Sequence, residues 1–259
     1  MIDPGDYTIA ELKKILAQKE VNLKLIGKLR CDSRKGVQQL AQKYIKQRQQ
    51  KQRLQNKWEQ MNKWEQNLRL RDINHIAGLD EAGRGPLAGP VAAAAVILNP
   101  REKILGIDDS KALSVTRREV LYEKIAKKSL AWASALVSPE EIDRLNIQQA
   151  SILAMKKAVF SLEQQPEYLL IDGHSEISDL DIEQQTIIDG DCRCNCIAAA
   201  SIMAKVTRDK FIDEYHHQYP QYNFKSNKGY GTAEHIAALK KYGPSPIHRF
   251  SFAPVKKYS

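Results

Sequence analysis

The sequence has no long hydrophobic run and few cysteines. Nowhere in its 259 residues is there a stretch approaching the ~18 uncharged apolar residues of a membrane span, so we expect no transmembrane helix. The segment that carries Asp3, Asp6 and Glu11 lacks the apolar centre of a signal peptide. We therefore expect a cytoplasmic protein whose four cysteines are reduced thiols.

The cysteines give little reason to expect zinc. Cys192, Cys194 and Cys196 alternate along one segment, and Cys31 stands alone. Structural zinc sites usually space paired cysteines by two to four residues and complete a tetrahedron with ligands from elsewhere. Here the fourth ligand would be Cys31 or a distant histidine, and free cysteine also behaves as a small buried apolar residue. We favour buried apolar cysteines over a zinc site.

Positive charge is concentrated in the first quarter of the chain. Residues 1–72 hold 17 Lys and Arg and 8 Asp and Glu, an excess that equals the formal net charge of +9 of the whole chain. The remaining residues are therefore neutral in sum. A basic segment beside a neutral one suggests a polyanionic partner such as nucleic acid, although basic helices are often only solvated faces.

The basic segment, residues 1–71, has the pattern of a helical extension. Thr8–Glu11 fits a capping box at the start of a short helix that ends near Gln18. Asp32 or Ser33 could begin a much longer helix that runs toward Arg71. Its apolar residues recur every three or four positions in a stripe too narrow for a core of its own. The extension could dock on the main domain, pair with a partner or lie along nucleic acid.

From residue 72 to residue 259 the pattern is that of an α/β domain. Apolar strand-like runs occur at Ile73–Leu79, Val91–Leu98, Leu130–Val137 and Tyr168–Asp172. Helical stretches lie at Thr116–Lys128, Pro139–Leu145, Ile147–Leu162, Ile197–Tyr215 and Thr232–Tyr242. Strands that first follow one another and then alternate with helices predict an α/β architecture with a mixed β-sheet flanked by helices.

Two adjacent carboxylates stand at the end of the first strand. Asp80 and Glu81 precede a turn formed by Gly83, Arg84 and Gly85. Successive strand residues point to opposite faces, so we expect the chain to bend if both acids serve one site. Glycines permit a bend and let a bulky anion approach the backbone.

Other acids occupy positions typical of metal ligands. Asp172 ends a later strand, and Asp191 precedes the helix near residue 197; ligands of open α/β sheets gather at the carboxyl ends of strands. Asp189 and Asp209 compete with Asp191, and any of these acids could merely cap a turn or form an ion pair. Oxygen ligands without a matching His/Cys set favour Mg²⁺ or Mn²⁺. Two such ions can hydrolyse a phosphodiester.

Three further segments combine short polar groups with a cation or an aromatic ring. Lys228–Thr232 is a glycine loop that carries Tyr230, which could stack on a sugar or base. Asp109–Ala112 and His248–Phe252 have the composition of phosphate contacts. Each segment alone is weak evidence.

Together these segments resemble the ribonuclease HII family, in the family's order and over about residues 73–255. The matching segments are Gly78–Pro90, Asp109–Lys111, Ile171–Gly173, Gly190–Asp191, Ala198–Asp209, Lys228–Thr232 and His248–Phe252. The resemblance implies an RNase H-like fold in which four acids are catalytic and bind two Mn²⁺ or Mg²⁺ ions: Asp80, Glu81, Asp172 and Asp191. It favours Asp191 over Asp189 and Asp209, because the family's acid follows a glycine and precedes an Ala/Ser-rich helix. Asp189 stands where the family often has Lys, which adds negative charge near the metals.

The resemblance also implies the reaction, hydrolysis of the RNA strand of RNA–DNA hybrids. It includes cleavage on the 5′ side of single ribonucleotides in duplex DNA, leaving 3′-hydroxyl and 5′-phosphate ends. The Gly-Arg-Gly backbone is expected to contact the ribose 2′-hydroxyl, and Tyr230 to contact the deoxyribose at the RNA–DNA junction. Substrate contacts are thus expected from Gly83, Arg84, Gly85, Ser110, Lys111 and Tyr230.

The basic extension is not part of the motif set, although some Gram-positive members carry a similar one. We expect it to strengthen duplex binding, and we expect a monomer without a membrane partner. Two other interpretations stay open at this point, a non-catalytic hybrid-binding protein and a nuclease for DNA alone. Four acids in a nucleic-acid groove weaken binding unless a cation is present, which disfavours the first, and a ribose requirement would exclude the second.

Overall fold

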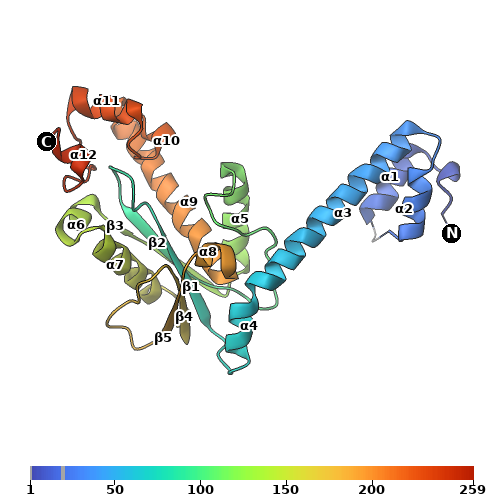
Figure 1. Cartoon of the computed structure of the whole chain (residues 1–259), viewed down its shortest axis with the longest axis horizontal. Helices are drawn as coiled ribbons and strands as arrows, with labels where there is room; N and C mark the ends of the chain where they lie inside the picture. Colours follow the sequence, from blue (N-terminus) through green and yellow to red (C-terminus); the bar gives the residue numbers. More distant parts are fainter. Residues whose placement is uncertain (1, 19–20) are drawn as a thin grey trace. The chain divides into compact units, whose positions relative to one another are not determined.

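The computed structural model describes residues 2–18 and 21–259 (Figure 1). By packing, the chain divides into two compact units, Met1–Lys57 and Trp58–Ser259, and each is described by itself below. In the described part of the chain, no helix is both long enough and apolar enough to cross a membrane.

The first unit is a small helical bundle with its own hydrophobic core. It contains α1 (Ile9–Gln18), α2 (Leu23–Arg30) and the first part of α3 (Lys35–Met61), after a short 3₁₀ turn at Pro4–Asp6. The predicted narrow stripe without a core was wrong, because the sequence pattern did not reveal α2. The buried side chains that the three helices share are Leu12, Leu16, Val21, Ile26, Leu29, Val37 and Ala41.

The start of α1 was predicted from the sequence, whereas α2 was not. Thr8 Oγ1 accepts the Glu11 amide at 3.3 Å and a Glu11 carboxylate oxygen accepts the Thr8 amide at 2.8 Å, which confirms the capping box. The α2 helix begins after Asn22, whose side chain accepts the amide of Lys24 at 2.9 Å. Gly27 in the middle of this short helix weakened its signal in the sequence.

The long helix predicted to reach Arg71 is interrupted at Asn62. The α3 helix ends at Met61, and a separate α4 runs from Lys63 to Arg69. Trp58, Met61 and Leu68 are buried in the hydrophobic core beside the β-sheet, so by packing residues 58–71 group with the second unit. The domain boundary at residue 72 stays a prediction.

A five-stranded mixed sheet forms the centre of the second unit. Its strands are β1 (Ile76–Ala82), β2 (Val91–Ile97), β3 (Ala131–Val137), β4 (Tyr168–Asp172) and β5 (Glu183–Ile187), in the order β3-β2-β1-β4-β5. The first three strands pair antiparallel, whereas β4 and β5 are parallel to β1. The predicted mixed sheet is confirmed. The edge strand β5 was missed because its sequence, EQQTI, is mostly polar.

Helices cover both faces of the sheet (Figure 1). On one face lie α5 (Val115–Lys128) and the long α9 (Asn195–Gln218), and on the other lie α6 (Pro139–Leu145) and α7 (Ile147–Phe160). Gly78 lets α9 rest directly on β1, because a Cβ at this position would lie 2.1 Å from the backbone carbon of Cys196.

A third group of buried side chains follows the end of α9. It involves the 3₁₀ turn Pro220–Tyr222 and the helices α10 (Phe224–Asn227), α11 (Ala233–Tyr242) and α12 (Ala253–Lys256). The predicted helices of the second unit are all present, with ends shifted by a few residues. The four-residue α8 (Gly190–Arg193) precedes α9 and carries one of the candidate acids.

Candidate active site

The first strand continues through both of its acids. The bend predicted at Asp80 and Glu81 was wrong, because β1 keeps its pairing with β2 up to Ala82. On its other side, pairing with β4 stops at Leu79 opposite Ile171. Asp80 and Glu81 therefore lie on opposite faces of β1. Both lie just beyond the last residue of β1 that pairs with β4, and so both border the same open edge of the sheet.

Asp80 is buried against α9. Its side chain is only 5% exposed; one of its oxygens accepts the Glu81 amide at 2.6 Å, and it also hydrogen-bonds the Ser201 hydroxyl. Burial, together with the negative charges of Glu81, Asp172 and Asp191, raises the pKa of Asp80 well above its usual range.

Glu81 lies on the α7 side of the sheet. Its carboxylate accepts a hydrogen bond from Arg84 Nη1 at 3.2 Å, and the Arg84 guanidinium also donates to Gln148 on α7. A cavity of about 230 Å³ has Glu81, Arg84, Gln148 and Asp172 in its lining. Burial raises the pKa of Glu81, while the charge of Arg84 opposes the shift.

Asp172 and Asp191 are joined through backbone hydrogen bonds. The Asp172 carboxylate accepts the Gly190 amide at 2.7 Å and also the amide of Asp191. A Cβ on Gly190 would lie 2.6 Å from the Ile197 side chain and 3.2 Å from an Asp172 oxygen, so glycine lets α8 approach. Burial, followed by the negative charge of Asp172, raises the pKa of Asp191 to about 6.

The competing acids are placed differently. Asp209 forms an ion pair with Lys205 one turn earlier on α9, at 2.7 Å, which agrees with the structural role expected for it. Asp189 is exposed in a left-handed conformation with φ of 53°. The four acids Asp80, Glu81, Asp172 and Asp191 interact electrostatically with one another.

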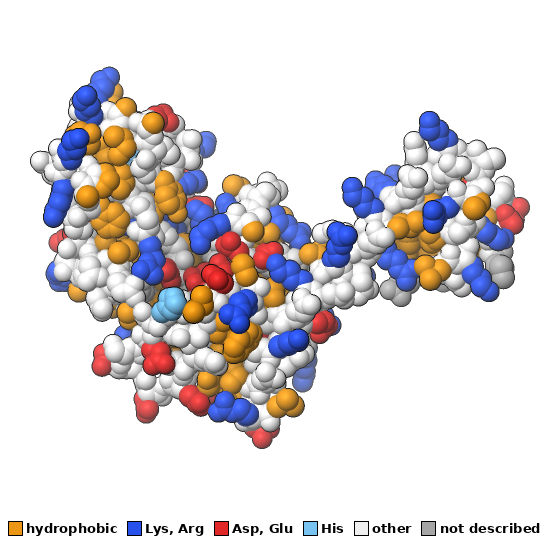
Figure 2. Space-filling view, in the orientation of Figure 1, with side chains coloured by type: hydrophobic (Ala, Val, Ile, Leu, Met, Phe, Trp, Pro, Cys, Tyr) orange, Lys and Arg blue, Asp and Glu red, His pale blue; other side chains and the backbone are white. Residues whose placement is uncertain are grey.

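This group of acids has little compensating positive charge. Lys111 faces it: burial opposes its charge, but Asp109, Asp80, Asp191 and Asp172 raise the pKa of Lys111 above its usual value. Acidic side chains gather in the middle of the second unit in Figure 2, with Lys and Arg around them. Four mutually repelling carboxylates with only oxygen donors fit hard divalent cations such as Mg²⁺ and Mn²⁺.

Two buried arginines hold the glycine loop beside the acids. Arg249 donates to the carbonyl oxygens of Gly83 at 2.6 Å, Arg84 at 2.9 Å and Gly89 at 2.9 Å. Arg208 donates likewise to three backbone carbonyls, those of Ala88, Pro90 and Lys228. Both side chains are fully buried, so the predicted phosphate contact by the His248–Phe252 segment does not fit Arg249.

The remaining predicted substrate contacts differ in exposure. Tyr230 is 43% exposed, and its ring lies beside the loop, since a Cβ on Gly85 would be 3.7 Å from it. Ser110 is only 3% exposed and shares a hydrogen bond of 3.0 Å with Ser201. Ser110 thus supports the serine that contacts Asp80, while Lys111 next to it faces the acids.

Sequence reasoning missed two residues of this site and gave a third another role. Ser201 and Gln148 were not predicted, although they contact Asp80 and Arg84. Arg249 was expected to contact phosphate but binds the Gly83 carbonyl. Ser201 lies within the Ala/Ser-rich helix, which could have marked it. Nothing in the local sequence pattern singled out Gln148.

The cysteine trio separates in the structure. Cys192 is exposed, whereas Cys194 and Cys196 are buried, with their sulfur atoms 3.4 Å apart. Glu65 on α4 joins them as the third possible metal ligand found among the described residues, and tetrahedral zinc sites use four ligands. The Glu65 carboxylate instead accepts the Cys196 amide at 2.9 Å, which caps the start of α9 and fixes α4 against it.

Comparison with known proteins gives consistent results along the chain. Residues 77–255 match the family model described as Ribonuclease HII, and residues 8–69 match the model described as Ribonuclease HII N-terminal domain. The chain is 48% identical to a ribonuclease HII from Bacillus licheniformis, over 97% of this chain and 98% of that protein.

Solved structures agree with this match and support the predicted RNase H-like fold. The ribonuclease H2 from Pyrococcus horikoshii is 26% identical with a TM-score of 0.60, over 71% of this chain and 96% of that one. RNase HII from Archaeoglobus fulgidus, solved as a complex with PCNA, is also 26% identical with a TM-score of 0.60, over 69% of this chain and 95% of that one.

Proposed function

This chain belongs to the ribonuclease HII family and is a ribonuclease H, an endonuclease that acts on RNA–DNA hybrids, and from that premise we propose that it also cuts duplex DNA on the 5′ side of a single embedded ribonucleotide. The products have 3′-hydroxyl and 5′-phosphate ends. This activity suits a cytoplasmic, monomeric enzyme that removes ribonucleotides during replication and repair.

The main support for the proposal is the convergence of four carboxylates beside an exposed glycine loop. Asp80, Glu81 and Asp172 meet where β4 ends and β1 continues, and Asp191 is tied to Asp172 through the backbone of α8. A cluster with this much uncompensated negative charge repels a phosphodiester unless cations are bound. The site therefore suits metal-dependent hydrolysis.

We assign the metal contacts by position. Asp80 and Asp172 lie centrally and would hold both of two divalent ions, Mg²⁺ or Mn²⁺, while Glu81 and Asp191 would each complete the coordination of one. When bound, such a pair of ions lowers the pKa of the attacking water and stabilises the leaving oxygen. Ser201 keeps the Asp80 carboxylate oriented by its hydrogen bond, and Ser110 in turn orients Ser201.

Two cations of the chain, Lys111 and Arg84, are suited to bind the negatively charged phosphate of the substrate. Lys111 faces the acids and is suited to bind a non-bridging phosphate oxygen of the substrate. Arg84 is held by Glu81 and Gln148, so its guanidinium lies at the wall of the cavity, where it is suited to bind the scissile phosphate. Both residues thus position the phosphodiester.

Selection of RNA depends on the backbone of the glycine loop. A trans peptide points its N–H away from its own C=O, and Arg249 binds the Gly83 and Arg84 carbonyls from inside. The amides of Arg84 and Gly85 consequently point outward, and within residues 2–18 and 21–259 neither has a hydrogen-bond partner. They are suited to bind the ribose 2′-hydroxyl, the group that distinguishes RNA from DNA at one nucleotide.

Tyr230 lies where it can contact the next sugar. Its ring borders Gly85 and is partly open to solvent. A flat apolar ring packs against a deoxyribose more readily than against a ribose, whose 2′-hydroxyl would lose water. Tyr230 therefore favours substrates in which the ribonucleotide is followed by DNA.

The proposal is tested with a labelled DNA duplex that contains one ribonucleotide, incubated with Mg²⁺, Mn²⁺ or EDTA beside an all-DNA duplex. Metal-dependent cutting only on the 5′ side of the ribonucleotide is the expected result. Binding without cutting in either metal would indicate a hybrid-binding protein without this activity. Cutting of the all-DNA duplex would refute the recognition of the 2′-hydroxyl.

A further inference from the structure

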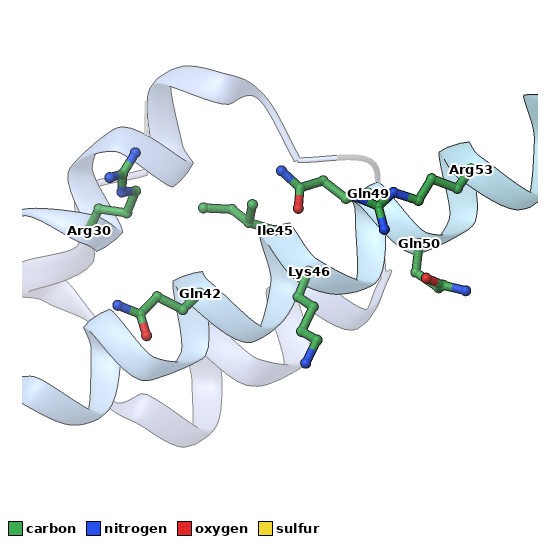
Figure 3. Close-up of a pocket in the computed structure, with 7 residues that line it drawn as sticks. All are labelled: Arg30, Gln42, Ile45, Lys46, Gln49, Gln50 and Arg53. Atoms are coloured by element: carbon green, nitrogen blue, oxygen red, sulfur yellow. The ribbon is translucent and has the colours of Figure 1, made fainter.

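A shallow basic groove runs along α3 in the first unit. It has a volume of about 580 Å³ and is lined by the cations Arg30, Lys46 and Arg53 together with the amide side chains of Gln42, Gln49 and Gln50. Figure 3 shows these side chains along α3, with Arg30 entering from the neighbouring α2. Among the described residues that line this groove there is no carboxylate.

A second hollow continues the groove on the same helix. Its lining includes Lys43, Lys46, Gln50 and Lys51, so Lys46 and Gln50 belong to both hollows. Within each hollow the lining positions recur at steps of three and four residues, so each hollow follows one stripe of α3, and the two stripes are adjacent. We call this continuous surface, from residue 42 to residue 54 with Arg30, the α3 surface. At 1.5 Å per residue it is about 18 Å long.

The charge of the α3 surface is of one sign. From residue 35 to residue 57 the chain has seven Lys and Arg and no Asp or Glu. Two of the acids elsewhere in the unit are already engaged, since Asp3 pairs with Lys28 at 3.2 Å and Asp32 with Arg34 at 2.8 Å. Among the described residues, Arg30, Lys46 and Arg53 form no ion pair. Their charge is available to a partner.

We propose that the α3 surface binds the sugar–phosphate backbone of the substrate duplex. The inference rests on the proposed function, because that function makes a nucleic-acid duplex the polyanion that the protein meets. Lys and Arg neutralise phosphates, and Gln amides donate hydrogen bonds to phosphate oxygens. A length of about 18 Å matches about five phosphates along one strand at 3.4 Å each. Such contacts fix the duplex without reading its sequence.

The proposal predicts a salt dependence that can be measured. Each neutralised phosphate releases counterions, so that log K falls with log salt by about 0.9 per contact. Replacing Arg30, Lys46 and Arg53 by Gln in the full chain should lower the slope by up to about 2.7. These side chains are exposed, so the triple variant is expected to keep its fold.

A matched control separates local contacts from overall charge. Lys13, Lys14 and Lys24 are exposed in the same unit and lie outside the α3 surface. The triple variant Lys13→Gln, Lys14→Gln, Lys24→Gln loses the same net charge. The probe is a fluorescent DNA duplex with one ribonucleotide, titrated in EDTA between about 50 and 200 mM salt. EDTA prevents cleavage, so binding alone is measured.

Three outcomes decide the matter. A slope lowered in the Arg30/Lys46/Arg53 variant and nearly unchanged in the control supports the proposal. Equal changes of the slope in both variants would mean that only net charge matters. Unchanged slopes in both variants would assign the α3 surface to another partner. Either result overturns the proposal. A charge reversal, Lys46→Glu, should weaken binding further, because Lys46 lines both hollows. Cleavage of the same duplex by wild type in Mg²⁺ or Mn²⁺ tests the proposed function separately.

Discussion

The guanidinium of Arg249 lies under Gly83 and donates a hydrogen bond of 2.6 Å to its carbonyl oxygen. The same side chain also holds the carbonyls of Arg84 and Gly89. It is fully buried, and burial together with the charge of Arg208 lowers the pKa of Arg249 to about 9. A buried cation without a carboxylate partner is unfavourable, and here three carbonyl oxygens compensate it by shaping the loop.

We predict that Arg249→Lys impairs the recognition of ribose more than it impairs folding. Lysine has no planar fork and cannot hold three separated carbonyls at once. Substitution of a residue that orients the groups of a site from behind typically reduces activity about 10–100-fold. The measurement is kcat/KM on a duplex with one ribonucleotide and on an RNA–DNA hybrid, with Arg101→Lys, an exposed position, as control. A folded variant with unchanged rates and unchanged preference between the two substrates would contradict a positioning role.

Asp172→Asn should abolish cleavage and leave binding of the duplex intact. Asparagine keeps the oxygen that accepts the Gly190 amide, so α8 stays in place, but the ligand for the metals loses its charge. We expect the rate to fall by at least about 10²–10³-fold, the effect of removing one electrostatic stabiliser. Single-turnover cleavage and anisotropy in EDTA measure the two properties, with the exposed Asp181→Asn as control. Loss of binding as well would point to a structural role for Asp172.

The electrostatics of the site also predict a pH-dependent gain in stability for Asp191→Asn. The pKa of Asp191 is raised to about 6 by burial and by Asp172, so its contribution to stability is full below the unfolded value near 4 and is lost as the pH rises through about 6. At pH 8 the neutral Asn removes this repulsion. At pH 5 the folded Asp191 is mostly protonated but the unfolded side chain is mostly ionised, so the substitution still stabilises the protein, by less than at pH 8.

The check is the melting temperature of both proteins in EDTA at the two pH values. The variant should melt at a higher temperature than wild type at pH 8, and the difference in melting temperature should be smaller at pH 5. Comparison at each pH cancels the opposite effect of His235 and His248, whose pKa values are lowered by burial and which destabilise the fold on acidification. A larger gain in melting temperature at pH 5 than at pH 8 would show that the expected direction of the pH dependence is wrong.

The four acids could be found from the sequence because each lies near the end of a strand or at the start of a short helix. Their geometry could not be found in this way. Asp80 and Glu81 reach one edge because β4 ends beside them, and no periodicity within β1 reports where a neighbouring strand ends. The bend that we expected followed from treating the strand in isolation.

Elements that depend on tertiary contacts were missed for the same physical reason. The polar β5 is stabilised by its ladder with β4, and α2 by side chains of α1 and α3; neither has a strong pattern of its own. Arg249 resembled a phosphate ligand, because a cation between polar residues has the same local sequence whether it faces solvent or backbone carbonyls. Burial distinguishes the two, and burial is a property of the folded chain.

Tyr230→Ala is predicted to weaken cleavage at RNA–DNA junctions selectively. Removal of a ring that stacks on nucleic acid costs about 1–3 kcal/mol, which corresponds to about 5–160-fold in rate. The comparison is between a duplex with one ribonucleotide and an uninterrupted hybrid. Tyr242→Ala, at 52% exposure, removes a ring of equal size as control. Equal loss on both substrates would argue against a role in reading the junction.

Substitution of Gly78 and of Gly27 by alanine should change the stability of the protein in opposite directions, which tests the packing of α9 on β1. A Cβ on Gly78 would lie 2.1 Å from the Cys196 backbone carbon and 2.4 Å from the Ile197 amide nitrogen, whereas a Cβ on Gly27 meets nothing within 4 Å. Backbone atoms of a long buried helix cannot move aside as a side-chain tip can, so Gly78→Ala should destabilise the protein by at least about 1–3 kcal/mol. Gly27→Ala lies in the interior of α2 and should stabilise its helix by about 0.5–1 kcal/mol. Urea unfolding of both variants decides the matter. If Gly78→Ala were as stable as wild type, α9 would not rest on β1 as closely as described, and Asp80 would then lose its contact with Ser201.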